Sequence, residues 1–128
     1  MRILIVALAL AVFIPAGAAV LKGQGPEDLF KPGQEVYTEN CAMCHRANGE
    51  GLPVKFPALN KNPLVLGDPQ PVIGVVLNGR KGNLGKMPSW KDKLNDQEIA
   101  GVVTYIRGAW DNKTPAVTPE MVQALRGK

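Results

Sequence analysis

The sequence predicts a small all-α domain, with three to five helices joined by long loops. Three observations support this prediction. Apolar side chains repeat at helical spacing over residues 95–110, two cysteines stand one helical turn apart at positions 41 and 44, and no two segments read as a pair of strands. A chain of 128 residues has room for one domain with one modest core.

The first 21 residues have the pattern of a signal peptide or of an N-terminal membrane anchor. A charged start precedes the apolar run Ile3–Ile14, and the small residues Ala16–Ala18 offer a cleavage site. The uncharged stretch 3–21 is also long enough to span a bilayer as an anchor. We favour cleavage because Pro15 and the small residues after it interrupt the run. In either case, the rest of the chain is predicted to be exported, to the periplasm or to the outer face of the cytoplasmic membrane.

Residues 22–31, rich in glycine and charge, are predicted to form a linker before the main domain at 32–110. Pro32 suits the first residue of a helix, which should run through Gly33 and Tyr37 into the cysteine pair. Residues 47–71, rich in proline and glycine, predict a mostly ordered loop. Ordered loops of this length are uncommon unless something else organises them.

A short apolar helix is predicted over 71–78, closed by Gly79, and a glycine-rich basic loop over 80–89. The clearest helix is predicted to follow Asn95, which with Glu98 three residues later resembles a capping box, although Ser or Thr is more usual than Asn at the first position. Its apolar stripe comprises Ile99, Val102, Val103, Ile106 and Trp110. Residues 111–128 are predicted to be a tail with a possible short helix over 119–125, capped by Thr118.

The segment Cys41-Ala42-Met43-Cys44-His45 carries the chemistry. Cysteines three apart on a helical turn share a face, so two thiols can form thioether bonds to one edge of a porphyrin, and His45 can bind the iron. His45 is also the only histidine of the chain. A disulfide, a thioredoxin-like redox pair and a zinc site are the alternatives. Zinc needs about four ligands and a thioredoxin pair needs a βαβ setting, so we favour covalent haem c through Cys41 and Cys44.

A haem iron bound by one histidine needs a second axial ligand or stays open to small molecules. Met87 is the best candidate among the four methionines, because it ends a glycine-rich loop and is stiffened by Pro88. Met1 lies in the export segment, Met43 lies between the cysteines and Met121 lies in the tail. The alternative role for Met87 is to fill a gap in the core, the commoner use of methionine.

These motifs together resemble a class I (mitochondrial-type) cytochrome c in its bacterial single-haem form. The resemblance covers about residues 32–110 and follows the motifs Gly33-x-x-x-Tyr37, Cys41-x-x-Cys44-His45, Asn48-Gly49-x-Gly51-x-Pro53, Phe56-Pro57-x-Leu59, Met87-Pro88-x-Trp90 and Glu98-Ile99…Tyr105-Ile106. It implies a small cytochrome c fold, with helices and long loops wrapped around one covalently bound haem.

The resemblance also implies roles for individual residues. Gly33 should let the first helix cross closely against the last long helix, near Tyr105. The carbonyl of Pro57 should accept the second ring N–H of His45. Trp90 is expected near a haem propionate, or packed on the haem rim. Iron held by His45 and Met87 would have a relatively high potential.

The formal charge is +4, and basic residues gather around Met87: Arg80, Lys81, Lys86, Lys91 and Lys93. A basic rim steers association with redox partners that have an acidic docking surface, such as a reductase and a terminal oxidase or dehydrogenase. The alternative is a solvated loop whose lysines serve solubility. Nucleic acid is not expected as a partner of an exported haem protein.

Three functions remain open on this sequence. The first is a one-electron carrier, free or tethered through residues 3–21, that shuttles between respiratory or periplasmic partners. The second is a fixed haem c subunit of a larger membrane or dehydrogenase complex. The third is a haem sensor or peroxidase, which a Met87 ligand argues against. No nucleophile, paired catalytic carboxylates or phosphate loop is recognisable, so an independent enzyme is not expected.

Overall fold

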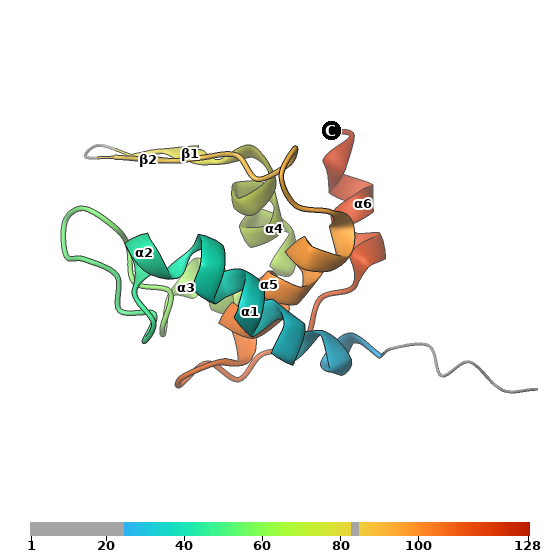
Figure 1. Cartoon of the computed structure of the whole chain (residues 1–128), viewed down its shortest axis with the longest axis horizontal. Helices are drawn as coiled ribbons and strands as arrows, with labels where there is room; N and C mark the ends of the chain where they lie inside the picture. Colours follow the sequence, from blue (N-terminus) through green and yellow to red (C-terminus); the bar gives the residue numbers. More distant parts are fainter. Residues whose placement is uncertain (1–24, 83–84) are drawn as a thin grey trace, which may run out of the picture.

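A computed structural model describes residues 25–82 and 85–128 (Figure 1). Its elements in chain order are a 3-10 helix Pro26–Leu29, α1 Phe30–Asn40, α2 Ala42–His45, α3 Pro63–Leu66, α4 Pro69–Asn78, β1 Arg80–Lys81, β2 Lys86–Met87, α5 Asp96–Gly108 and α6 Pro119–Arg126. The all-α prediction is confirmed: within these residues the named strands are two residues long, and four of the helices have eight residues or more.

The predicted leader or anchor at 1–21 lies outside the described residues. Within residues 25–82 and 85–128, the longest helix has 13 residues, and none has the length and apolar character needed to cross a bilayer.

The first helix begins earlier than predicted, and part of the expected linker is helical. Leu29 is 3% exposed in the core, and the ring of Phe30 packs on Tyr105 at 5.1 Å between centroids. Burial of Leu29 and the ring contact of Phe30, which stays 37% exposed, hold residues 26–31 on the domain. Pro32 is compatible with the earlier start because the first N–H groups of a helix have no intrahelical acceptor.

Helices α1 and α5 cross at a contact between two glycines. A Cβ on Gly33 would lie only 1.9 Å from the carbonyl oxygen of Gly101, so the backbones meet without side chains between them. Tyr105, one turn further along α5, packs on Tyr37 at 5.2 Å between ring centroids. The predicted close crossing near Tyr105 is therefore present, and Gly101 is its other half.

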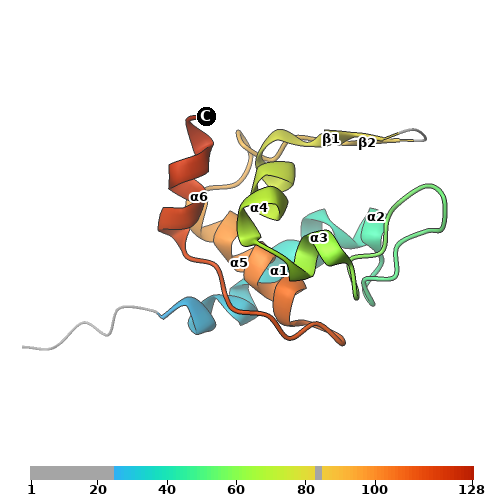
Figure 2. The same ribbon diagram turned by 180° about the vertical axis from the view of Figure 1, so that it is seen from behind.

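Helix α5 is the centre of the molecule rather than a helix with one buried stripe. Figure 1 shows α1 on one face of α5, and Figure 2 shows α3 and α4 on the other. Residues 99–107 are all buried as a result. The helix ends at Gly108, so Trp110 lies beyond it with a φ of +57°, and its ring packs on Tyr37 and Tyr105.

A buried arginine joins α5 to the loops. Arg107 is 3% exposed, and its guanidinium donates to the carbonyl oxygens of Val65 (2.6 Å), Gly67 (2.8 Å) and Pro115 (3.1 Å). Burial lowers the pKa of Arg107, and the nearby charge of Asp68 opposes this shift. These hydrogen bonds satisfy a charge that would otherwise be costly to bury.

Two predicted loops contain regular structure. The 47–71 loop includes the single turn α3, capped by the Asn62 side chain. Helix α4 starts at Pro69 rather than at Pro71, because Asp68 caps it by accepting from the N–H of Gln70. The basic loop after Gly79 is a β-hairpin in which Arg80 pairs with Met87 and Lys81 with Lys86. Strands of two residues are too short for an alternating pattern to predict.

The predicted capping box of α5 is present, because Asn95 accepts from the N–H of Glu98 and Glu98 accepts from the N–H of Asn95. The predicted tail helix is also present as α6, with Thr118 as its N-cap. Local chemistry alone was enough to place these two helix starts.

Candidate functional site

A cavity of about 510 Å³ opens between the β1–β2 hairpin and the turn that holds α2. This volume is in the range of small-molecule and cofactor sites, about 300–1,000 Å³. All six predicted site residues line it: Cys41, Cys44, His45, Pro57, Met87 and Trp90. The other lining residues are Asn40, Val54, Lys55, Phe56, Arg80, Gly82, Gly85, Lys86 and Pro88.

The two cysteines lie where α1 passes into α2. The N–H of Cys41 donates to Tyr37 (2.8 Å), and the carbonyl of Cys41 accepts from Cys44 (3.2 Å) and His45 (2.9 Å). This one continuous helical turn brings both thiols to the cavity wall.

The chemistry of the thiols disfavours two of the alternatives. Both thiols are free rather than joined in a disulfide. Burial, with a smaller contribution from Cys44, raises the pKa of Cys41 to about 11. A thioredoxin-like nucleophile has a lowered pKa, so the raised pKa of Cys41 does not fit that role.

His45 is 8% exposed, and its Nδ1 lies 2.9 Å from the carbonyl oxygen of Pro57, as the resemblance implied. A carbonyl can only accept, so in the neutral imidazole the proton lies on Nδ1 and Nε2 keeps its lone pair. Gly51 makes room for this partner, because a Cβ there would lie 2.6 Å from the Pro57 oxygen. The φ of Gly51 is +63°, a conformation that favours glycine.

A tyrosine fixes the chain just after His45. The hydroxyl of Tyr37 donates to the carbonyl oxygen of Arg46 at 2.6 Å, where the chain turns with a φ of +62°. Burial is the main reason that the pKa of Tyr37 is raised, so the hydroxyl keeps its proton near neutral pH and remains a donor. The histidine is thus held from α1, α2 and the Pro57 loop together.

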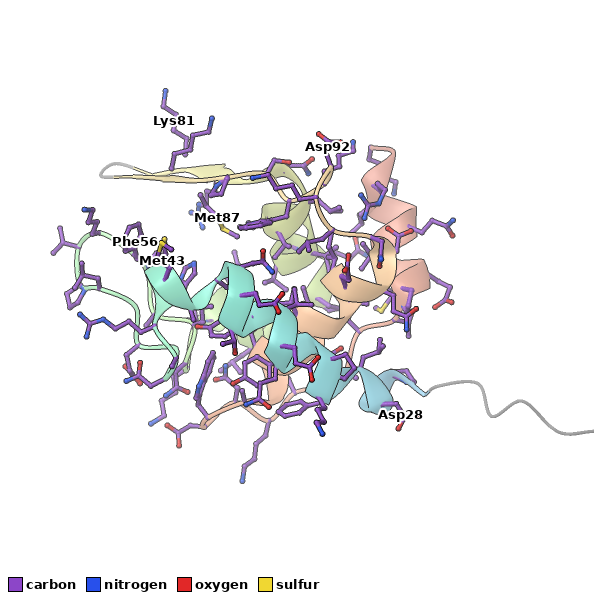
Figure 3. The ribbon with its side chains drawn as sticks, viewed as in Figure 1. Asp28, Met43, Phe56, Lys81, Met87 and Asp92 are labelled. Carbon is purple, nitrogen blue, oxygen red and sulfur yellow. The ribbon has the colours of Figure 1, made fainter. Side chains whose placement is uncertain are left out.

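Met87 reaches the cavity from the hairpin. Figure 3 shows its side chain on the side of the hairpin that faces α2, whereas Lys81 points away from the cavity. Among the described methionines, Met43 is 94% exposed and Met121, 37% exposed, lies in α6 outside the cavity. Among the described residues, Met87 is therefore the methionine that lines the same cavity as His45.

The backbone around Met87 is fastened to the end of α4. A Cβ on Gly79, whose φ is +73°, would lie 2.5 Å from the carbonyl oxygen of Met87. Ser89 Oγ donates to the carbonyl of Leu77 at 2.6 Å, and the N–H of Trp90 donates to Val76 at 3.1 Å. The Met87 loop is therefore held by backbone groups of another helix, which sequence spacing does not reveal.

The basic residues near the cavity differ partly from the predicted set. Arg80 and Lys86 line the cavity, and Lys93 Nζ lies 5.2 Å from the ring centroid of Trp90. Lys55, which the sequence argument missed, also lines the cavity and lies over Phe56 at 5.6 Å. Its position two residues before Pro57 was the available signal. Lys81 does not line the cavity.

This arrangement fits a covalently bound haem. Two free thiols, an imidazole with a free Nε2 and a thioether converge on one cavity, and Phe56, Pro88 and Trp90 give it apolar walls. Thiols, imidazole and thioether are the ligand types that c-type haem uses. Within residues 25–82 and 85–128, the cavity included, no three His, Cys, Asp or Glu side chains converge as a zinc site requires.

Comparisons with known proteins agree with this chemistry. The model of the family described as "Cytochrome C oxidase, cbb3-type, subunit III" matches residues 28–106. The chain is 39% identical to the cytochrome c subunit of the quinone-type alcohol dehydrogenase of Gluconobacter oxydans (strain 621H), over 73% of this chain. It spans only 22% of that subunit's length. It is 33% identical to cytochrome c-552 of Thermus thermophilus, over 75% of this chain and 85% of that protein.

A solved structure shares the fold. The crystal structure of the c-type cytochrome XoxG from Methylobacterium extorquens AM1 superposes with a TM-score of 0.51, covering 77% of this chain and 65% of that one. At 21% sequence identity, this likeness supports the fold alone.

Proposed function

Because the chain belongs to the cytochrome c family, with a domain of the cbb3 type, we propose that His45 and Met87 are the two axial ligands of its haem iron. The protein is an electron carrier with one haem c, bound covalently through Cys41 and Cys44. The bound haem supplies one-electron chemistry at its iron. The observation that carries the proposal is a single cavity lined by both cysteines, by His45, whose Nδ1 is bound to Pro57, and by Met87.

The identity of the ligands and the residues around them set the orientation of His45 and the reduction potential of the iron. The Pro57 carbonyl orients the His45 ring, and a methionine ligand gives a higher potential than a second histidine would. The partly buried Trp90 packs against the core and lines the cavity. In this proposal Trp90 lies beside a haem propionate or on the haem rim.

Substitution of Met87 tests the ligand assignment. Met87→Ala should abolish the weak charge-transfer absorption of sulfur on ferric haem, lower the potential and let carbon monoxide bind the reduced protein readily. Met121→Ala is the matched control, because Met121 lies outside the cavity and should leave all three readouts unchanged. The assignment is wrong if Met121→Ala, and not Met87→Ala, removes the sulfur absorption.

We further propose that the carrier docks on redox partners through the basic residues at the cavity mouth. Arg80, Lys86 and Lys55 line the cavity, and Lys93 lies over the ring of Trp90, which also lines it. Such a surface selects a partner with an acidic face and speeds the encounter with it. Export to the periplasm or the outer membrane face, and anchoring through residues 3–21, belong to the same proposal, and N-terminal sequencing of the native protein tests them.

A fixed haem subunit is the second candidate, favoured by the likeness to a dehydrogenase subunit more than four times as long as the matched part. The salt dependence of the electron-transfer rate distinguishes a mobile carrier from a fixed subunit. For a mobile carrier, the second-order rate with an acidic partner should fall as salt rises, because the Debye length shrinks from about 30 Å at 0.01 M to about 10 Å at 0.1 M. Charge reversal at Lys55 and Lys86 should slow the same step. A first-order rate indifferent to salt and to both lysines would identify a fixed subunit.

A further inference from the structure

Helix α6 lies beyond residues 28–106, the part of the chain that matches the family, yet it is a fixed part of the fold. Val122 is fully buried, and Leu125 packs against the core. Thr118 caps the helix, and Pro119 occupies its first position. Figure 1 shows α6 beside α5, with the chain that leads from the hairpin into α5 running past it.

Arg126, at the end of α6, forms hydrogen bonds to the chain that leads from the hairpin into α5. Arg126 Nε donates to Asp96 Oδ1 at 2.6 Å, Nη2 donates to the carbonyl of Leu94 at 3.0 Å, and Nη1 donates to the carbonyl of Lys91. The Arg126 and Asp96 side chains are 26% and 28% exposed, so the pair is largely shielded from water. A planar guanidinium suits this set of three acceptors, which a single ammonium cannot span.

The chain segment that Arg126 binds follows directly after Met87. We call residues 87–94 the Met segment. On one side it is bound to α4, because the N–H groups of Trp90 and Lys91 donate to the carbonyls of Val76 and Leu77, each at 3.1 Å. At its end the segment forms a turn, in which the N–H groups of Lys93 and Leu94 donate to the carbonyl oxygen of Trp90, each at 3.0 Å. Arg126 closes this turn from the other side.

We propose that Arg126 is a positioning residue that holds the Met segment closed, and so keeps Met87 in the cavity. This proposal rests on the proposed function, in which Met87 is the axial ligand. Met87 can leave the cavity only when its segment opens, and such local opening has a free energy set by the contacts that must break. Hydrogen bonds from a charged group are among the stronger of these contacts.

Arg126→Gln tests the proposal with two readouts. Carbon monoxide binding to the reduced protein requires Met87 to leave, so its rate should rise about tenfold, which corresponds to about 1.4 kcal/mol of opening free energy. Hydrogen exchange at the Trp90 and Lys91 amides should speed up by a similar factor, and this readout does not depend on the iron. Arg126→Lys should give a smaller rise in both, because the charge remains but the fork is lost.

Thr114→Val is the matched control in the same tail. Thr114 Oγ donates to the carbonyl of Arg107 at 2.8 Å, a hydrogen bond from the tail to α5 that does not involve the Met segment. This variant should lower global stability and leave carbon monoxide binding unchanged. Equal effects of Thr114→Val and Arg126→Gln would overturn the proposal, since they would indicate a general loosening.

The two levels of the proposal fail in different ways. If the unaltered protein lacks the sulfur absorption and Met87→Ala leaves carbon monoxide binding unchanged, the ligand assignment fails. If the sulfur absorption is present but Arg126→Gln leaves both the binding rate and the exchange of the Trp90 and Lys91 amides within twofold of the unaltered protein, the role of Arg126 is rejected.

Discussion

The two walls of the cavity are built in different ways. The wall with His45 is one run of helical backbone from Tyr37 through Cys41, and its outside partner is Pro57, twelve residues further on. The wall with Met87 is a two-residue strand followed by a turn. Its fastenings come from α4 and from Arg126 at the end of α6. One proposed ligand therefore sits on a rigid local unit, and the other on a segment that distant elements hold.

Both walls nevertheless use the same backbone device. Gly51 and Gly79 have φ values of +63° and +73°, and each lies against backbone carbonyls, those of Phe56 and Pro57 for Gly51 and that of Met87 for Gly79. A Cβ would lie 2.4 Å from the Phe56 oxygen at Gly51, and 2.5 Å from the Met87 oxygen at Gly79. The two walls are thus packed equally closely. They differ in the residues that hold them, which are near in sequence for the His45 wall and distant in sequence for the Met87 wall. A wall held from afar can open while the rest of the fold stays intact.

The largest expected effects come from alanine at these two glycines. A left-handed backbone and a clash with a carbonyl oxygen should together cost each variant about 2 kcal/mol of unfolding free energy or more. Gly79→Ala should in addition speed carbon monoxide binding by the reduced protein, because the strain acts on the Met87 backbone. Gly51→Ala should leave that rate nearly unchanged. Denaturant titration and stopped-flow mixing measure the two quantities.

Gly74→Ala in α4 is the control, because a Cβ there meets no atom within 4 Å. It should raise stability by up to about 1 kcal/mol, the helix preference of alanine over glycine. If Gly51→Ala and Gly79→Ala speed carbon monoxide binding equally, the contrast between a rigid and a detachable wall is wrong.

Much of the His45 wall was predictable because its information is local. The cysteine spacing indicates a shared helical face, and the Phe56-Pro57 motif, read through the family resemblance, implied the carbonyl partner of His45. Helix starts were predictable for the same reason, since Asn95 and Thr118 act on N–H groups within three residues of themselves.

The restraints on the Met87 wall were not predictable from sequence. A hairpin of two-residue strands has no periodicity, and Arg126 bonds to carbonyls more than 30 residues away. The buried Arg107 was missed in the same way, because a basic residue in a helix predicts exposure unless the carbonyls that surround it are known. Every residue has the same backbone carbonyl oxygen, so the sequence does not indicate which carbonyls an arginine side chain will bind.

The smallest expected effects separate the walls most cleanly, because the two substitutions are alike. Tyr37→Phe and Ser89→Ala each remove one hydroxyl that donates to a backbone carbonyl at 2.6 Å, the first behind His45 and the second behind Met87. Each loss should cost about 1 kcal/mol, with the smaller cost at the exposed Ser89, where water can replace the bond.

For Tyr37→Phe this cost should appear only in global unfolding, because the His45 wall opens with the whole fold. For Ser89→Ala it should appear in the opening of the Met segment, and a loss of about 1 kcal/mol raises the open population about fivefold. Carbon monoxide binding should therefore speed up by up to that factor in Ser89→Ala and stay unchanged in Tyr37→Phe. The reverse ranking would mean that the helical wall, and not the hairpin wall, is the one that opens.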